Sequence, residues 1–155
     1  MIVRRAVVKD LKRIQELNLL LFEKEFAEYD NSLSLDWIFG KVGSKYFKDA
    51  ITKEDSCVFV VEDGGKVVGY LAGGECSVED YRKLSKVAEL NDMLVLEEFR
   101  GKGVGKMLYS AFVDWCRKRG VKRVRVEATA QNKEAIEFYR KVGIKDYSLV
   151  LEGEI

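Results

Sequence analysis

One stretch of the chain carries most of the information about its fold: Met93-Leu-Val-Leu-Glu-Glu-Phe-Arg-Gly-Lys-Gly-Val-Gly-Lys-Met-Leu108, an apolar, strand-like run that meets a short basic glycine loop. The three glycines leave the loop backbone without Cβ atoms that would keep a ligand away. Beyond the loop, apolar residues recur at the i, i+3, i+4 spacing of one helix face: Val104, Met107, Leu108, Ala111, Phe112 and Trp115.

The loop therefore forms the N-terminus of a helix, where unpaired N–H groups and the positive end of the helix dipole favour an anion. Arg100, Lys102 and Lys106 add positive charge around it. A strand, a glycine loop and a helix in this order predict a phosphate-binding site.

Composition narrows the class of protein. The 155 residues suit a single domain, residues 1–155, and the net charge of +1 gives no reason to expect a nucleic-acid partner. No stretch approaches the roughly 20 apolar residues of a membrane span. The N-terminus begins like a strand and lacks the apolar core of a signal peptide. We therefore expect a cytoplasmic protein that does not act at a membrane.

The chain contains no histidine, which excludes histidine bases, Ser-His and Cys-His nucleophile pairs and most zinc sites. The three cysteines, Cys57, Cys76 and Cys116, lie far apart and have no metal-ligand spacing, so we expect no metal and interpret them as small buried hydrophobes. Proton transfer must then use carboxylates, tyrosine, lysine or water.

Hydrophobic periodicity predicts the order β-α-α-β-β-β-α-β-α-β, which indicates an α/β sandwich built on one sheet. Helices are expected after Asp10, around residues 37–51, at Val104–Arg119 and between Asn132 and Gly143. Strands are expected at Ile2–Val7, Cys57–Val61, Val67–Gly73, Ala88–Leu96, Val121–Ala128 and Tyr147–Leu151. The second and third strands form a hairpin, because Asp-Gly-Gly between them supplies the positive φ angles of a tight turn.

Two common phosphate-binding motifs do not fit the loop. A Walker A loop needs Ser or Thr after Gly-Lys, and this chain has Met107 there. A dinucleotide fingerprint needs a sixth-position glycine, and this chain has Lys106. The pattern that fits, Arg100-x-x-Gly103-x-Gly105 between a strand and a helix, resembles the acyl-coenzyme A loop of the GCN5-related N-acetyltransferase (GNAT) superfamily.

A second segment, Asn132-Lys-Glu-Ala-Ile-Glu-Phe-Tyr-Arg-Lys-Val-Gly-Ile144, is similar to that family's Asn-x-x-Ala-x-x-Phe-Tyr-x-x-x-Gly-Phe motif, with Ile144 in place of Phe. Weaker similarity extends to Val3–Leu17 and Phe59–Gly73. The resemblance implies an α+β sandwich with a mixed, mostly antiparallel sheet flanked by helices.

The resemblance also implies an enzyme that moves an acetyl group from acetyl-CoA to a primary amine by direct attack in a ternary complex. Its loop amides would cradle the coenzyme's pyrophosphate, and free backbone groups of the preceding strand would pair with pantetheine and hold the oxyanion. The coenzyme-binding residues implied are Leu94, Val95, Leu96, Arg100, Gly101, Lys102, Gly103, Val104, Gly105, Lys106, Asn132 and Tyr139.

For catalysis, the resemblance implies Tyr139 as the general acid that protonates the departing thiolate. Glu89 lies eleven residues before Arg100, which resembles the position of the glutamate base in the histone-modifying branch of the family. Asp92, Glu127 and water remain alternative bases. Asn132 matches a coenzyme contact and is equally an N-cap residue.

The sequence does not identify the amine that accepts the acetyl group. An acidic segment at Leu21–Asp36 suits a cationic acceptor, such as a small amine or a protein or peptide amine, but is equally a solvated helix face. Two rival functions are a non-catalytic acyl-CoA-binding or sensing module and a nucleotide-binding regulator. The apolar tail Tyr147–Ile155 is compatible with a homodimer that pairs C-terminal strands.

Overall fold

The computed structural model describes residues 1–155 and contains one five-stranded sheet in the order β1-β2-β3-β4-β5. Neighbouring strands are antiparallel except β4 and β5, which run parallel, so the sheet is mixed and mostly antiparallel as predicted. The strands are β1 (Ile2–Arg5), β2 (Ser56–Asp63), β3 (Lys66–Cys76), β4 (Val87–Val95) and β5 (Arg123–Val126).

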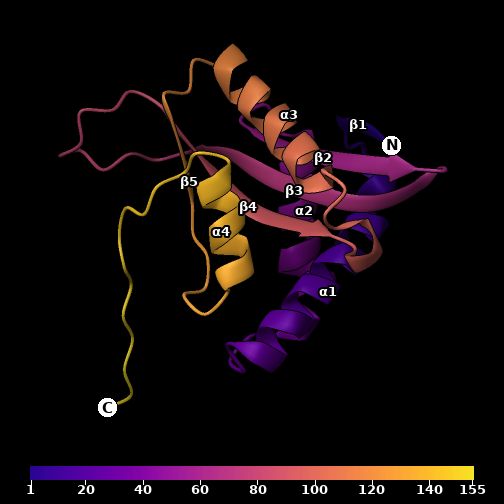
Figure 1. Ribbon diagram of the computed structural model, residues 1–155, viewed down its shortest axis with the longest axis horizontal. Helices are drawn as coiled ribbons and strands as arrows, with labels where there is room; N and C mark the ends of the chain where they lie inside the picture. The colour runs from indigo at the N-terminus through magenta and orange to yellow at the C-terminus, as the bar shows by residue number, and fades with distance from the viewer.

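Helices cover both faces of the sheet (Figure 1). They are α1 (Leu11–Glu28), α2 (Lys41–Thr52), α3 (Val104–Lys118) and α4 (Lys133–Lys141), with 3-10 turns at Val8–Asp10, Leu35–Phe39 and Glu97–Phe99. Two cores result, one on each face. The core under α1 and α2 includes Ile14 and Phe47, and the core under α3 includes Leu108 and Phe112.

The helical segment predicted around residues 37–51 forms in two pieces, a 3-10 turn and α2, because two glycines intervene. A Cβ atom at Gly43 would lie 2.1 Å from the carbonyl oxygen of Trp37, so only glycine allows the turn to lie this close to the helix. The break brings Trp37 within 5.6 Å of Tyr46, measured between ring centroids.

A bulge in β4 changes which face its side chains occupy. Ala72 of β3 pairs with Asp92 and Gly73 pairs with Leu90, which leaves Asn91 unpaired. Strand side chains alternate between faces, and one extra residue inverts the alternation. Before the bulge, Leu90 packs in the core under α3, whereas Leu94 packs in the core under α1 and α2.

Strands β4 and β5 separate at the same level. The parallel pairing runs from Val87 with Arg123 to Leu90 with Val126 and then stops. The remaining residues of β4, from Asn91 to Val95, keep β3 on one side and have no strand on the other. This leaves an open strand edge that leads directly to the glycine loop.

The strand predicted at Tyr147–Leu151 does not form. These residues have no strand pairing, and Leu149, Val150 and Leu151 are 67% to 82% exposed. The tail extends away from the body of the molecule (Figure 1). The pattern was wrong for this chain because a strand needs a partner edge, and no strand pairs with this apolar run. The guanidinium of Arg82 lies over the ring of Tyr147, 4.7 Å from its centroid.

Candidate active site

The glycines of the loop meet two different requirements. Gly101 and Gly103 adopt positive φ angles of 69° and 83°, which disfavour any side chain with a Cβ atom. Gly105 is needed for packing, since a Cβ atom there would lie 3.1 Å from the Cε2 atom of Phe138. The loop therefore turns tightly into α3 while α4 lies directly against the first turn of that helix.

No side chain caps the start of α3. Gly103 is its N-cap residue, and the first helical hydrogen bond runs from the Met107 N–H to the Gly103 carbonyl, at 3.0 Å. The N–H groups of Val104, Gly105 and Lys106 in the first turn have no acceptor within the helix. They form the anion-binding end that the sequence predicts, and Lys106 stands beside them.

A cavity of about 330 Å³ joins this helix start to the open edge of β4, and α1 and α4 form its other walls. Ten residues predicted to bind the coenzyme line it: Leu94, Val95, Arg100, Gly101, Gly103, Val104, Gly105, Lys106, Asn132 and Tyr139. Leu96 and Lys102, also predicted, are not among the lining residues. The Nζ atom of Lys102 lies 5.5 Å from the ring centroid of Phe99.

The outward backbone groups of β4 differ from those expected. The Leu96 N–H donates to the Val68 carbonyl of β3, at 3.0 Å. Because antiparallel strands bond through alternate residues, Leu94 also faces β3, and Met93 and Val95 face the open edge. Met93 lines the cavity and was missed from sequence, since the alternation of backbone direction depends on a register that no single residue type reveals.

Charged side chains cross the mouth of the cavity. Glu134 of α4 lies 3.6 Å from Lys24 of α1 and 4.0 Å from Arg100. The Nε atom of Arg100 also donates to the Val95 carbonyl, at 3.0 Å. Arg100 therefore supports the end of β4 and stands at the cavity with its charge partly neutralised.

Tyr139 is buried in the cavity wall with 9% of its surface exposed. Burial, together with the negative charges of Asp92 and Glu25, raises its pKa, so its phenol keeps its proton at neutral pH. A protonated phenol in this position is able to donate to a leaving anion. Nearby, the Asn132 Oδ1 atom accepts from the Ala135 N–H at 3.1 Å, which is an N-cap bond of α4.

The three candidate bases have different surroundings. None of them is among the residues that line the cavity. Glu89 lies 3.3 Å from Arg125, which also lies 3.6 Å from Glu79. Glu127 is exposed. Asp92 accepts from the hydroxyl of Tyr46 at 3.1 Å and from the Nδ2 atom of Asn18 at 3.3 Å.

No cationic side chain pairs with Asp92. Burial is the largest influence on its carboxyl and raises the pKa, although the hydrogen bonds from Tyr46 and Asn18 oppose the rise.

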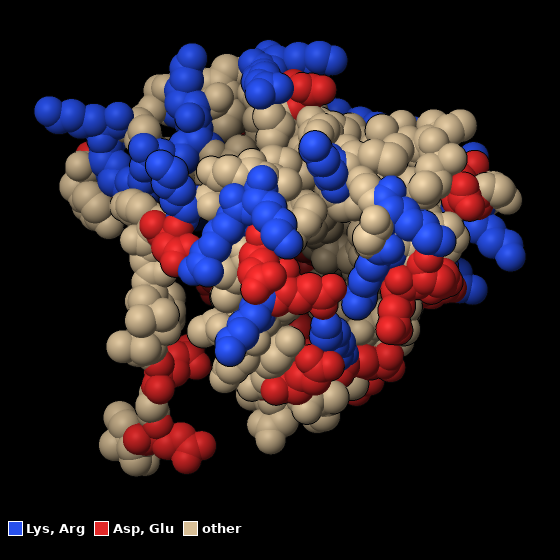
Figure 2. All heavy atoms as spheres, in the orientation of Figure 1, with Lys and Arg blue, Asp and Glu red and all other residues tan.

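The acidic segment predicted to wall an acceptor lies on the C-terminal half of α1. Acidic side chains gather over this part of the molecule, at the bottom of the view (Figure 2). Of these residues, Glu25 lines the cavity, and burial followed by the charge of Asp92 raises its pKa. The nearby aromatic rings mainly pack on one another: Phe22 and Trp37 are stacked with centroids 6.1 Å apart.

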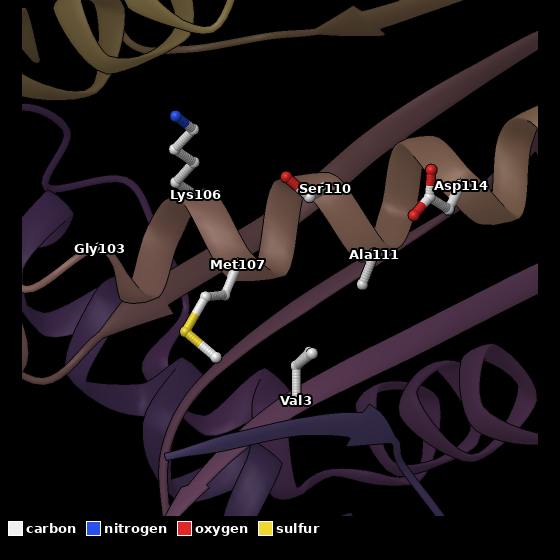
Figure 3. Close-up of a pocket in the computed structure, with 7 residues that line it drawn as sticks. All are labelled: Val3, Gly103, Lys106, Met107, Ser110, Ala111 and Asp114. Atoms are coloured by element: carbon white, nitrogen blue, oxygen red, sulfur yellow. The ribbon is translucent and has the colours of Figure 1, made fainter.

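A second hollow, of about 480 Å³, lies on the other side of α3 next to β1 (Figure 3). Met107 and Ala111 point toward Val3 across it, whereas Lys106, Ser110 and Asp114 point away from Val3. It brings together no set of reactive groups. The cavity beside β4 is therefore the candidate active site.

None of the helices is both long and apolar enough to cross a membrane. No group of three or more acidic, cysteine or histidine side chains is arranged to hold a metal ion.

Relatives in sequence are acetyltransferases by name. An uncharacterised N-acetyltransferase from Methanocaldococcus jannaschii is 33% identical over 105 residues, which are 68% of this chain and 46% of that protein. An N-alpha-acetyltransferase from Sulfurisphaera tokodaii is 24% identical over 153 residues, 96% of this chain and 82% of that protein. The chain spans about half the length of the first curated relatives it matches, 46% and 57%.

Solved structures share the fold. A tetramutant of a Bacillus halodurans protein superposes with a TM-score of 0.87 at 22% identity over 100% of both chains. Aminoglycoside N-acetyltransferase AAC(6')-Iy, bound to a bisubstrate analogue of coenzyme A and an aminoglycoside derivative, superposes with a TM-score of 0.77 at 16% identity over 99% of this chain and 97% of that one. A model of the acetyltransferase (GNAT) family matches residues 11–144, and the chain belongs to that family.

Proposed function

We propose that this protein is an N-acetyltransferase that transfers the acetyl group of acetyl-CoA to a primary amine by direct attack in a ternary complex. One observation carries the proposal: a single cavity joins an uncapped helix start, an open strand edge and a buried, protonated tyrosine. These are the three groups that an anionic, amide-rich thioester donor requires.

The residues present fit coenzyme A. The first-turn N–H groups of α3 and the side chain of Lys106 suit the pyrophosphate. The outward N–H and carbonyl groups of Met93 and the outward N–H group of Val95 suit the amides of pantetheine, which would add to the sheet like a further strand. An N–H on the same edge would polarise the thioester carbonyl and stabilise the oxyanion. Asn132 caps α4 and contributes to the same wall.

Tyr139 is our choice for the general acid. As the nitrogen bonds to the acetyl carbon, the carbon–sulfur bond breaks and the sulfur leaves with the electron pair. Tyr139 gives the sulfur its phenolic proton, and a proton shed by the nitrogen restores the phenol. Its raised pKa suits this role, because the phenol is protonated before the reaction and becomes a strong base after donating.

The acceptor is a primary amine whose identity is open. Names among the relatives and fold neighbours refer to three kinds of amine: protein N-termini, an amino sugar phosphate and aminoglycosides. The carboxylate of Glu25, on the α1 side of the cavity, supports an acceptor that arrives as a cation. Among the candidate bases, Glu89 is already paired with Arg125, at 3.3 Å.

We also propose that two copies associate through the C-terminal tail. The tail residues Leu149, Val150 and Leu151 are exposed, and β5 has a free edge. An exposed apolar run and an unpaired strand edge favour pairing between chains. Light scattering during size-exclusion chromatography measures the mass in solution, and removal of residues 147–155 should convert a dimer to a monomer.

Free thiol release from acetyl-CoA in the presence of a panel of primary amines tests the function. We expect release that depends on the amine. Tight coenzyme binding without release for any amine would instead support the alternative, a non-catalytic acyl-CoA-binding module. Comparable affinity for ATP or NAD would support a nucleotide-binding regulator.

A further inference from the structure

We infer that Asp92, Asn18 and Tyr46 form the subsite that receives the ammonium group of the acceptor, and that the Asp92 carboxylate takes its proton. The inference rests on the proposed function, because it concerns the acceptor side of the same reaction. It replaces Glu89 with Asp92 as the base, and it commits to an acceptor that enters as a cation.

The bulge in β4 puts Asp92 in the right place. Asn91 is unpaired, so the alternation of side chains is inverted and Asp92 points to the face covered by α1 and α2. There it meets Asn18 of α1 and Tyr46 of α2. The next residue, Met93, has its backbone on the open edge where the thioester is expected. The carboxylate and the reacting carbon are therefore held by consecutive residues of one strand.

Asp92 lacks a counter-charge. Its two hydrogen-bond donors, Tyr46 and Asn18, are neutral, whereas Glu89 has Arg125. A carboxylate in a poorly solvated site is costly unless a cation joins it. Asp92 is half-buried and directly precedes Met93, which lines the cavity, although Asp92 itself is not among the lining residues.

Asn18 supplies an independent sign that a donor is missing. Its side chain is fully buried, with 0% exposed, and its Nδ2 atom donates to the hydroxyl of Tyr70 at 2.7 Å and to Asp92. Its Oδ1 atom, on the same amide, is buried and has no hydrogen-bond partner. Buried polar atoms normally have partners, so this oxygen marks a place for a donor from outside the chain.

An ammonium group matches these requirements and a hydroxyl does not. It carries three N–H donors and a positive charge. One donor satisfies Asp92 and a second satisfies the Oδ1 atom of Asn18, while the charge supplies the missing partner. A hydroxyl has one donor and no charge, and it would leave one of the two oxygens unsatisfied.

Each proton of the ammonium has a destination. The ammonium gives one proton to Asp92, and the free amine attacks the acetyl carbon. Tyr139 then protonates the sulfur, and the second proton from the nitrogen restores the phenol of Tyr139. Asp92 then releases its proton to solvent. The ionisable groups facing Asp92 are Glu25 of α1, Tyr46 of α2, Tyr70 of β3, Glu89 of β4 and Tyr139 of α4. Asp92 is the one carboxyl group among them that hydrogen-bonds to the amide of Asn18.

The first test measures turnover. Asp92→Asn keeps the shape of the side chain and an oxygen for Asn18, and removes the charge. With n-butylamine as the acceptor, we expect kcat/KM to fall about 100-fold or more while the Kd for acetyl-CoA changes less than twofold. Asp49→Asn, which changes a half-buried aspartate of α2 paired with Lys45, is the matched control and should retain wild-type activity. An active wild type and an equally active Asp92→Asn variant would overturn the inference.

The second test measures binding and does not need turnover. In NMR titrations with coenzyme A present, n-butylammonium should perturb residues around Asp92 in the wild type and lose this effect in Asp92→Asn, and n-butanol should have none in either. Equal binding of n-butanol and n-butylammonium would overturn the subsite. If no amine releases thiol but n-butylammonium binds at Asp92, the proposed function fails and the subsite stands.

A third variant keeps the inference testable if Asp92→Asn does not fold. Tyr46→Phe retains the ring that packs against Trp37 and removes a hydrogen bond that lowers the pKa of Asp92. The acidic limb of the kcat/KM profile should therefore move to higher pH. A limb that stays in place in an active variant would exclude Asp92 as the group that titrates.

Discussion

The proposed donor and acceptor walls of the candidate active site use different chemistry. On the proposed coenzyme side, the open edge of β4 and the first turn of α3 present backbone N–H and carbonyl groups, and glycines keep the approach open. On the proposed acceptor side, side chains of α1, α2 and β4 meet behind the residues that line the cavity: the buried amide of Asn18, the hydroxyl of Tyr46 and the carboxylate of Asp92.

The difference explains which substrate the sequence identifies. Backbone recognition depends on a few glycines at fixed spacing, so it leaves a motif that many chains share. Side-chain recognition depends on residues brought together from distant elements, such as Asn18 and Asp92, which are 74 positions apart. The donor is therefore readable from a short motif, and the acceptor is readable only from the folded chain.

The largest expected effect lies where the two walls meet. Tyr139→Phe should lower kcat about 100-fold, since loss of a general acid typically costs 10² to 10⁴ in rate. The Kd for acetyl-CoA should stay within twofold, because the ring still packs in the wall. Stopped-flow thiol release and calorimetric titration measure the two quantities. Tyr109→Phe, a half-buried tyrosine of α3 outside the cavity, is the control. Full activity of Tyr139→Phe would remove this residue from the mechanism.

Next in size is a change that affects the coenzyme wall alone. Gly103→Val should weaken acetyl-CoA binding about tenfold or more, because valine in a positive-φ conformation costs on the order of 1–3 kcal/mol and distorts the helix start. Calorimetry measures the Kd. Gly153→Val is the control, since its Cβ atom would meet nothing. Unchanged affinity in Gly103→Val would contradict the assignment of the loop to the coenzyme.

Much of the coenzyme wall was predictable and much of the acceptor wall was not. The strand, loop and helix around Gly103 follow from local spacing, and the structure confirms them. Glu89 stays a prediction from its distance to Arg100 along the chain, and this count cannot detect the unpaired residue at position 91 that turns Asp92 toward Asn18 and Tyr46. The strand predicted at Tyr147–Leu151 does not form, because a strand depends on a partner edge that local pattern does not show.

A smaller effect concerns how α1, which carries the acceptor wall, is anchored. Arg4 of β1 makes two hydrogen bonds to Asp10 at the start of α1, at 2.8 Å and 3.0 Å, and these lower the pKa of Asp10. A lowered folded-state pKa stabilises the fold above the unfolded value of about 3.9, and the stabilisation is lost as pH falls through the folded value. Asp10→Asn should lower the free energy of unfolding at pH 7 by about 1–3 kcal/mol.

The free energy of unfolding should correspondingly fall less steeply with decreasing pH in Asp10→Asn than in the wild type. Urea denaturation between pH 3 and pH 7 measures this dependence. Asp63→Asn is the control, because its partner is the exposed N-terminal amine. Parallel pH profiles for the wild type and Asp10→Asn would contradict the role of this ion pair.

The smallest expected effect concerns a charged side chain at the mouth of the cavity, between the two walls. Glu134 pairs with Lys24 and lies near Arg100 across the cavity mouth. Glu134→Gln removes a negative charge close to the expected pyrophosphate and should tighten coenzyme binding about two- to threefold at low salt. The gain should vanish at about 1 M salt, where charges are screened. Glu137→Gln, exposed on the same helix, should not change the Kd.

The unpaired residue in β4 has a consequence for how such a chain is able to diverge. The unpaired Asn91 decides which side chains of the strand beyond Leu90 point to which face. With one residue fewer, Asp92 and Leu94 would exchange faces with Met93 and Val95. Substitutions are able to change the donor-facing and acceptor-facing residues one at a time, but the number of residues between Leu90 and the glycine loop has to stay constant, because a single deletion would exchange the two walls at once.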